Sequence, residues 1–398
     1  MALHAVRGYC ALCTAHCATI TENGQVVRLD PDPDHPNGGV MCAKGKAAPE
    51  LLYHPDRLNY PLRRTRPKGD SDPGWERISW NEALDDIAKR LRAIRERYGA
   101  RAVALAKGTR SGTSVDDAER WLGRFLNAFG SPNWVSTTHV CNWHKDTGFS
   151  YTFGVNLPTP DLTHSNAFLL WGHNPSFTSL ILAHDIVAAR ARGMKIIAVD
   201  PRRVGIASQA DILLQVRPGT DGALALALIH ALIEQAQYDE AFVRDWTNGP
   251  FLLNCDTGAA LTEADLTAAG RPDRYLVWDE ITQRPMIYDS LSGCYESDNI
   301  RPSLFGARTV RDNKGAEIRC QPCFSALANI AERYAPERSE TITWVPGKMV
   351  REAAHLLAAN RPASLYMWNG VGQHTNATQT SRAIAALYAL LGNIDQAG

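Results

Sequence analysis

The fold is decided by AFLLWGHNP (167–175), KIIAVDPRR (195–203) and ILLQVRPGTD (212–221), three apolar runs near the middle of the chain. Each run starts as a buried strand would and ends in glycine, proline and polar residues that stop it. A helical pattern covers about 179–192, and another helix opens at Asp221. This alternation of strands and helices predicts a parallel sheet in an α/β fold.

Polar residues at the ends of these runs form a candidate ligand site, because ligands on parallel sheets bind beyond the carboxyl ends of the strands. Gly172 permits close backbone approach, and the Asn174 amide can both donate and accept. Asp200 can bind ribose hydroxyls or a guanine edge, while Thr220 and Asp221 lie at a helix N-terminus that favours phosphate. Each residue alone could equally serve a turn or a cap. No G-x-G-x-x-G follows the first strand, which disfavours a simple nicotinamide site.

Further elements flank this region. A strand over 363–367 ends at Trp368–Gly372 and leads into a helix over about 377–391. Ser79, with Glu82 three residues later, predicts a capped helix that runs to about Gly99. Residues 255–320 carry many turn residues and are interpreted as an irregular insertion.

Four of the nine cysteines lie in the first 42 residues. Cys10, Cys13, Cys17 and Cys42 have the spacing C-x2-C-x3-C-x24-C, in which three thiolates share one loop and the fourth returns from elsewhere. This arrangement suits a [4Fe–4S] cluster better than zinc, whose structural sites pair ligands two by two, although spacing alone leaves zinc open. Lys44, beside Cys42, can carry charge to a neighbouring redox cofactor or can simply be a surface lysine.

Composition excludes several classes of protein. A chain of 398 residues predicts two to three structural units. Its 42 basic and 42 acidic residues give no net charge, which argues against a nucleic-acid partner. No apolar run approaches the roughly 20 residues that a membrane span needs, so direct membrane insertion is not expected. The start lacks a secretory signal and a twin-arginine pair before Cys10, which indicates the cytoplasm.

Taken together, these motifs resemble the molybdopterin oxidoreductase family, within the dimethyl sulfoxide reductase superfamily that uses bis-molybdopterin guanine dinucleotide. The resemblance runs along nearly the whole chain. It is carried by Cys10-x2-Cys13-x3-Cys17, Cys42-Ala-Lys44-Gly45, His54–Leu62, Ile78–Leu84, Gly172-x-Asn174-Pro175, Val199–Arg202 and Arg217–Asp221. It implies an α/β protein with a small N-terminal iron–sulfur domain and Rossmann-like parallel-sheet domains.

The resemblance also implies a division into domains. Residues 1–60 correspond to the [4Fe–4S] domain, and residues 61–140 plus 340–398 to a discontinuous α/β domain. Residues 141–339 correspond to a Rossmann-like domain that binds the molybdopterin dinucleotide. Family members continue into a C-terminal pterin-binding domain beyond the position of Gly398, so the chain is expected to be a truncated member.

Several residues match family positions that contact the cofactors. Lys44 resembles the lysine between the cluster and a pterin, and Asp200 and Asp221 resemble the carboxylates that contact guanine and ribose. The strand end from Trp368 to His374 resembles the segment that faces the second pterin. The remaining implied cofactor contacts are Gly172, Asn174, Pro175, Arg202, Gly219, Thr220, Gly370, Gly372 and His374.

The metal ligand in this family is serine, cysteine, selenocysteine or aspartate. Cys141 lies in the corresponding loop after Ser131–Trp134, and a thiolate is a soft ligand suited to molybdenum or tungsten. On loop chemistry alone, it would more commonly be an unreactive buried cysteine. His144 and His139 are candidates for handling protons near the substrate, or are packed histidines. The isolated C-x2-C at 320–323 is interpreted as incidental.

The resemblance implies an enzyme that exchanges two electrons with a small-molecule substrate at Cys141 and relays them through Lys44 to the cluster. An iron–sulfur electron-transfer subunit, or a membrane subunit linked to quinone, would be the partner. A non-redox tungsten hydratase resembling acetylene hydratase is an alternative, disfavoured because Thr14 replaces the aspartate that follows the second cluster cysteine. A third alternative is an inactive fragment that acts only as an iron–sulfur module.

Overall fold

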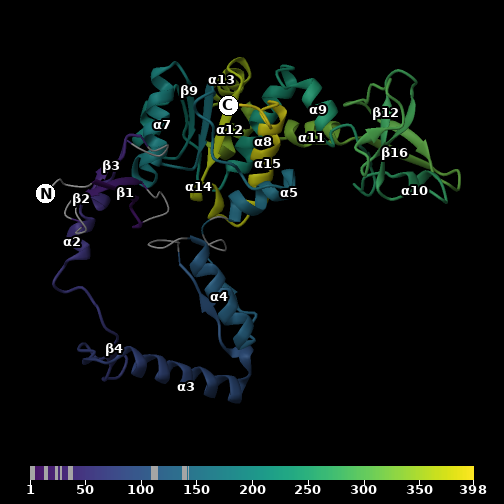
Figure 1. Ribbon diagram of the computed structural model, residues 1–398. Coiled ribbons are helices and arrows are strands. Elements are labelled where there is room, and N and C mark those ends of the chain that lie inside the picture. The colour runs from purple at the N-terminus through teal and green to yellow at the C-terminus, as the bar shows by residue number, and fades with distance from the viewer. Residues whose placement is uncertain are drawn as a thin grey trace. The chain divides into compact units, whose positions relative to one another are not determined.

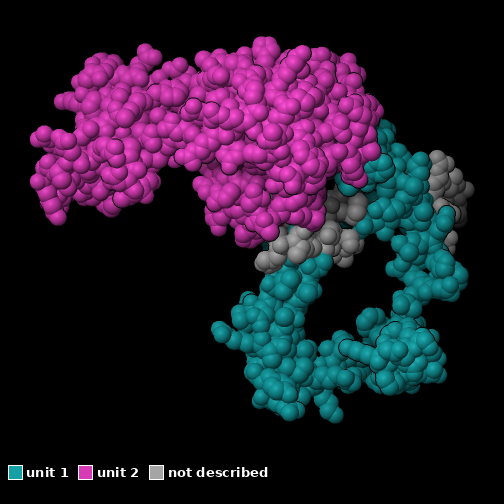
Figure 2. All heavy atoms as spheres, turned by 180° about the vertical axis from the view of Figure 1, so that it is seen from behind, with its two compact units in different colours: residues 1–141, 175–185 teal, residues 142–174, 186–398 magenta. Residues whose placement is uncertain are grey.

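The computed structural model describes residues 5–12, 17–22, 26, 29–34, 39–108, 115–136, 141 and 143–398. The chain separates into two compact units (Figure 2). Unit 1 comprises residues 1–141 and 175–185, and unit 2 comprises residues 142–174 and 186–398. Among the described helices, none combines the length and the apolar character that crossing a membrane would require.

A four-stranded parallel sheet with the order β10-β9-β8-β17 lies at the centre of unit 2 (Figure 1). Its strands are β8 (Ala167–Trp171), β9 (Lys195–Val199), β10 (Ile212–Leu214) and β17 (Ala363–Met367). Every side chain of β8 is buried, as expected for the continuous apolar sequence of a central parallel strand. The α/β class and the strands at 167–171 and 363–367 are therefore confirmed.

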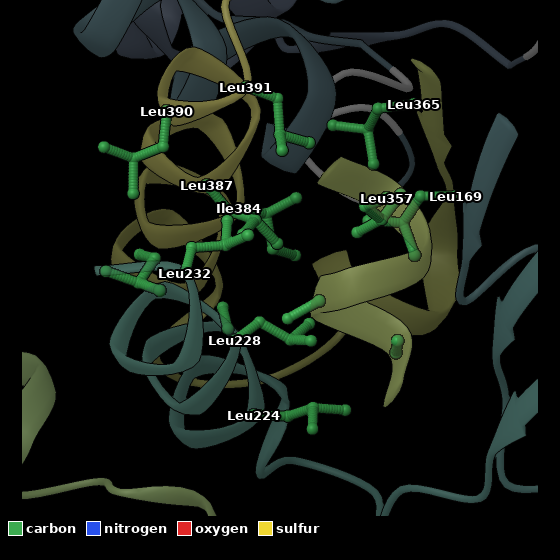
Figure 3. Close-up of a cluster of buried hydrophobic side chains, with 14 of the residues drawn as sticks. Leu169, Leu224, Leu228, Leu232, Leu357, Leu365, Ile384, Leu387, Leu390 and Leu391 are labelled. Atoms are coloured by element: carbon green, nitrogen blue, oxygen red, sulfur yellow. The ribbon is translucent and has the colours of Figure 1, made fainter. Parts of the chain in front are cut away.

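Three long helices pack their apolar sides into one core with this sheet: α8 (Asp221–Glu234), α13 (Gly347–Ala359) and α15 (Ala377–Leu390). Figure 3 shows leucines of α8 and α15 facing one another and the side chains of the sheet. Members of this core that are buried to within a few per cent are Leu169, Leu224, Leu228, Leu232, Leu357, Leu365, Ile384 and Leu387.

The other helices of unit 2 are short. They are the π-helix η3 (His144–Gly148), α5 (Phe149–Phe153), the 3-10 helix η4 (Gly205–Gln209), α9 (Glu240–Trp246), α10 (Glu263–Leu266), α11 (Cys323–Glu332), α12 (Pro336–Thr343) and α14 (Asn369–Gly372). Two further helices, α6 (Pro175–Thr178) and α7 (Leu180–Ala191), follow β8, and residues 175–185 of this stretch belong to unit 1.

The position of β17 differs from the grouping inferred from sequence, which placed residues 340–398 with residues 61–140. β17 pairs with β8 in parallel along its whole length, from Ala363 opposite Ala167 to Met367 opposite Trp171. The helix that follows, α15, packs on α8 in the same core. Residues from 340 onward therefore fold within unit 2.

Residues 252–322 form two small antiparallel sheets rather than the irregular insertion expected from the sequence. One has the order β11-β16-β15 and the other β12-β13-β14. The strands are β11 (Leu252–Asn254), β12 (Arg274–Asp279), β13 (Arg284–Asp289), β14 (Cys294–Tyr295), β15 (Arg308–Arg311) and β16 (Glu317–Pro322). The strands are short, so turn residues dominate the composition and conceal the strand pattern.

Asp279 fastens the turn that ends β12. Its side chain is fully buried and accepts hydrogen bonds from the backbone N–H groups of Ile281, Thr282 and Arg301, and from the Thr282 hydroxyl at 2.6 Å. Burial alone would raise the pKa of Asp279. The hydrogen bonds outweigh that effect and lower the pKa to about 2, because they stabilise the carboxylate.

Replacing Asp279 with alanine should destabilise these sheets by on the order of 3 kcal/mol, because three backbone N–H groups lose a buried, charged acceptor. The folded pKa lies below the ordinary value of 3.8, so this stabilisation is present above pH 4 and is lost as the pH falls toward 2. Hydrogen exchange of the β12 and β13 amides between pH 2 and pH 5 would measure it. Equal protection at both pH values in the parent chain would contradict the assignment.

Unit 1 contains small elements and two longer helices. A three-stranded antiparallel sheet consists of β1 (Ala5–Tyr9), β2 (Ala18–Glu22) and β3 (Asp30–Pro31), and the short helices α1 (Ala43–Lys46) and α2 (Ala48–Leu52) follow. The strand pairs are β4 (Leu62–Arg64) with β5 (Trp75–Arg77), and β6 (Leu105–Ala106) with β7 (Trp134–Val135). The remaining helices are α3 (Trp80–Tyr98), the 3-10 helix η1 (Ala100–Ala102) and α4 (Val115–Phe129). The predicted N-cap is confirmed, since the Ser79 hydroxyl accepts from the Glu82 amide at 3.1 Å.

Candidate functional site

The β1–β2 hairpin brings two of the predicted cluster ligands together. Cys10 directly follows β1 and Cys17 directly precedes β2, and the Cys10 amide donates to the Cys17 carbonyl at 2.8 Å. Both residues are buried, with 8% and 6% of their surface exposed. Cys13 lies outside the described residues. The hairpin therefore brings the backbones of Cys10 and Cys17 into direct contact.

The fourth predicted ligand comes from the start of α1. Cys42 is the N-cap residue of α1, and the helix packs against the hairpin at Gly45. A Cβ atom on Gly45 would lie 2.7 Å from Cγ of Met41 and 3.7 Å from Sγ of Cys10, so a larger residue there would have to displace the Met41 side chain. Gly45, three residues after Cys42, thus lies against Cys10. Cys10 and Cys17 are buried and Cys42 is half-buried, which are the donors that a thiolate-bound cluster uses, although the described residues form no group of three that could hold a metal ion. Lys44 lies on the exposed side of α1.

In unit 2, the loops after β8 and β17 touch through two glycines. The Gly370 amide donates to the Gly172 carbonyl at 3.0 Å. A Cβ on Gly172 would lie 2.9 Å from the Val371 nitrogen, and one on Gly370 would lie 2.7 Å from the Gly172 Cα. Gly172 also has a φ of +57°. The close backbone approach expected at Gly172 is thus an approach to Gly370, and it accounts for both glycines.

Asp221 lies at the first position of α8, at the carboxyl edge of the sheet. The Trp171 indole nitrogen donates to its carboxylate at 2.8 Å, and burial raises the pKa of Asp221 despite this hydrogen bond. Only 5% of Asp221 is exposed. Thr220, the residue before α8, donates its hydroxyl to the Arg217 carbonyl instead of capping the helix. Thr220 therefore leaves the N-terminus of α8 without a side-chain cap, while the Ala223 amide donates to the Thr220 carbonyl at 3.0 Å.

His374 connects the two sides of this edge. Its Nε2 lies 3.1 Å from the Gly370 carbonyl oxygen, and its Nδ1 would lie 3.5 Å from a Cβ on Gly219. Gly219 has a φ of +85°, which glycine adopts readily. The structure therefore brings together predicted cofactor contacts from three separate loops: Gly172, Gly219, Asp221, Gly370 and His374.

The remaining predicted contacts lie near this edge or in the neighbouring elements. Asp200 follows β9 and is buried, and one of its carboxylate oxygens accepts from the Arg202 amide at 2.8 Å. Asn174 follows the β8 loop, Pro175 opens α6, and Gly372 ends α14. The Asp200 carboxylate therefore stabilises the turn after β9, whether or not it also binds a ligand.

An aromatic group at the same edge was not predicted from the sequence. The rings of His173 and Trp368 stack with centroids 5.4 Å apart, and Tyr366 lies 5.5 Å from His173. The Lys145 ammonium lies 4.4 Å from the Trp368 ring. Burial, with the Lys145 charge, lowers the pKa of His173 to about 4, so its imidazole is neutral at pH 7. The sequence signal for this group was the spacing of Tyr366 and Trp368, which are two residues apart and therefore point to the same face of the sheet at the end of β17.

Cys141 is partly buried and precedes the π-helix η3. His144 begins η3, but its side chain lies outside the described residues, as does the whole of His139. The C-x2-C at 320–323 is a different case, because burial raises the pKa of both Cys320 and Cys323 to about 11. Their thiols are thus protonated and unreactive at neutral pH, in keeping with the interpretation of this motif as incidental.

These two sites agree with the comparisons to known proteins. The model of the molybdopterin oxidoreductase family matches residues 57–398, and the model of the molybdopterin oxidoreductase Fe4S4 domain matches residues 3–54. The chain belongs to the molybdopterin oxidoreductase family. Its cofactors are accordingly a [4Fe–4S] cluster and a molybdopterin that carries molybdenum or tungsten.

Individual relatives include both redox enzymes and a hydratase. The chain is 29% identical over 419 residues to the alpha subunit of perchlorate reductase from Dechloromonas aromatica, a match that covers 96% of this chain and 44% of that protein. It is 34% identical over 253 residues to acetylene hydratase of Syntrophotalea acetylenica, a match that covers 60% of this chain and 33% of that protein. The solved structure of acetylene hydratase from Pelobacter acetylenicus has the same fold, with a TM-score of 0.68, 24% identity and coverage of 98% of this chain and 44% of that chain. The chain thus spans less than half the length of these relatives.

Proposed function

We propose that the chain contributes to a molybdenum or tungsten oxidoreductase that uses bis-molybdopterin guanine dinucleotide. The proposal rests mainly on the strand-end residues around Gly172, Asp221, Gly370 and His374. Together they offer a carboxylate acceptor and closely approaching glycine loops, which suit the binding of a nucleotide. The bound metal would supply two-electron chemistry with the substrate. The buried Cys10 and Cys17 of the β1–β2 hairpin support an electron relay in the same chain.

The residues of the strand-end site have separable roles in this proposal. Asp221, oriented by Trp171, is placed to accept from guanine N–H groups, and the α8 amides are placed to hold phosphate. The His374 ring lies between the Gly219 and Gly370 loops and contacts both of them. Cys141 would be the protein ligand of the metal, His144 a proton carrier and Lys44 the charge relay toward the cluster.

Electron-transfer partners form part of the proposal. The relatives from perchlorate reductase and dimethylsulfide dehydrogenase are, by name, the alpha subunits of those enzymes. By analogy, we propose that an iron–sulfur protein receives or delivers electrons at the cluster, with a quinone-linked membrane protein beyond it.

Replacing Asp221 with asparagine should lower retention of the molybdopterin dinucleotide about tenfold, because the amide cannot replace a charge-assisted acceptor. Guanine nucleotide released by acid from anaerobically purified protein, together with molybdenum and tungsten by mass spectrometry, measures this retention. The matched control is Asp298→Asn at an exposed position, which should retain the parent amount. Equal retention by all three proteins would remove Asp221 from the nucleotide site.

A hydratase is the second candidate, favoured by the 34% identity to acetylene hydratase over 253 residues. The two activities separate by their need for an electron acceptor. An oxidoreductase turns over only with an acceptor or donor dye, whereas a hydratase would hydrate an alkyne without one. Turnover of acetylene in the absence of any dye would favour the hydratase.

A further inference from the structure

The segment that follows Cys141 is fastened to α15 by a tryptophan. The Trp143 indole nitrogen donates to the Thr378 hydroxyl at 2.8 Å, and Thr378 lies in the first turn of α15. Trp143 follows Cys141 by two residues, so at most about 7 Å of extended chain separates their Cα atoms. A contact that holds Trp143 therefore restricts where the Cys141 thiol can be.

A second attachment lies at the other end of η3. Gly148 is buried against α15, and a Cβ atom there would lie 2.3 Å from Cβ of Ser381. Ser381 is fully buried and donates its hydroxyl to the Ala377 carbonyl at 2.8 Å, so it cannot move aside. Only glycine at position 148 allows η3 to approach α15 this closely.

Between these two attachments, Lys145 lies over the Trp368 ring at 4.4 Å. The segment 143–148 thus contacts α15 at its two ends, through Trp143 and Gly148. Between them, Lys145 contacts the loop after β17. π-Helices are rare and are found frequently at functional sites. Here η3 begins at His144, directly after Trp143.

We propose that Trp143 and Gly148 are positioning residues for Cys141, which act through α15 to fix the segment that presents its thiolate to the metal. The inference rests on the proposed function in one respect, the assignment of Cys141 as a metal ligand. Its physical basis is that a ligand must be held within about 0.5 Å of its productive position by residues whose own places are fixed. Trp143 and Gly148 would supply that constraint from the two ends of the segment 143–148.

The test is the rate at which iodoacetamide alkylates Cys141 in the full chain purified without cofactor, read at that peptide by mass spectrometry. Trp143→Phe and Thr378→Val each remove the same hydrogen bond, so each should increase the rate about fivefold, and the double variant should be no faster. Thr378→Ser retains a hydroxyl and should keep the parent rate. Trp246→Phe, at a tryptophan that is 80% exposed, is the matched control and should change nothing.

A second pair of variants tests the attachment at Gly148. Gly148→Ala should accelerate the alkylation of Cys141, and adding Ser381→Gly should restore it because the Cβ contact at 2.3 Å is then relieved. Parent rates in both Trp143→Phe and Gly148→Ala would overturn the proposal. Accelerated alkylation of all cysteines together, with a lower melting temperature, would also overturn it, because Trp143 would then serve only general stability.

A further measurement separates this inference from the proposed function. In the cofactor-loaded chain, X-ray absorption at the metal edge should show one metal–sulfur contact fewer in Cys141→Ser and a weakened one in Trp143→Phe. If Cys141→Ser leaves the metal spectrum unchanged, the assignment of Cys141 as ligand fails. The alkylation rates need no metal, so they test the positioning in either case.

Discussion

Replacing Cys17 with serine is expected to remove the iron–sulfur cluster almost completely. The backbone carbonyl of residue 17, which accepts from the Cys10 amide at 2.8 Å, is the same in serine, so the β1–β2 hairpin should persist. Only the buried thiol is exchanged for a hydroxyl, a poor ligand for iron. Iron and acid-labile sulfide in anaerobically purified protein should fall from about four of each per chain to near zero.

The control for this change is Cys255→Ser, because Cys255 is exposed and lies among the antiparallel sheets of unit 2. That variant should keep the full iron content and the electron paramagnetic resonance signal of the reduced cluster. Zinc in place of iron in the parent chain would refute the cluster, and full iron content in Cys17→Ser would remove Cys17 from its ligands.

Replacing Gly172 with alanine is expected to cause the largest loss of stability in unit 2. A Cβ at this position would lie within 3.0 Å of backbone atoms of Gly370 and Val371, and neither backbone can yield without breaking the Gly370–Gly172 hydrogen bond. The φ of +57° adds strain for any residue with a side chain. We expect a loss of about 3 to 5 kcal/mol in the free energy of unfolding, measured by urea denaturation.

Gly154→Ala separates the two causes. Gly154 has a φ of +75°, but a Cβ there would meet no atom within 4 Å. This control therefore carries the strain of the positive φ without the collision, and it should cost only about 1 kcal/mol. Similar losses in the two variants would show that the contact between the Gly172 and Gly370 loops contributes little.

The parallel sheet could be predicted from the sequence because its strands are continuous apolar runs that end in turn residues. The pairing of β8 with β17 could not be predicted. Ala363 pairs with Ala167, which lies 196 positions earlier, and local sequence patterns contain no information about so distant a partner. The two small antiparallel sheets were missed for another reason. Their strands have between two and six residues, which is too short for alternation to stand out from the turns.

The candidate site was predicted in part. Cysteine spacing indicated the cluster, because three thiols on one loop are unusual for other purposes, and strand-end position indicated Asp200 and Asp221. The stacking of His173 on Trp368, with Lys145 above it, depends on how β8, β17 and η3 meet in space. The requirement for glycine at 172 likewise comes from Gly370, a residue on another strand end.

The pairing of β8 with β17 also has a consequence for biosynthesis. At about 5 to 20 residues per second, a ribosome needs roughly 10 to 40 s to extend the chain by the 196 positions that separate Ala363 from its partner Ala167. Throughout that interval, one edge of β8 lacks its final neighbour, while Gly370 and His374 have yet to be made. In a nascent chain, the Gly172 and Gly370 loops can therefore come together only after β17 has docked beside β8.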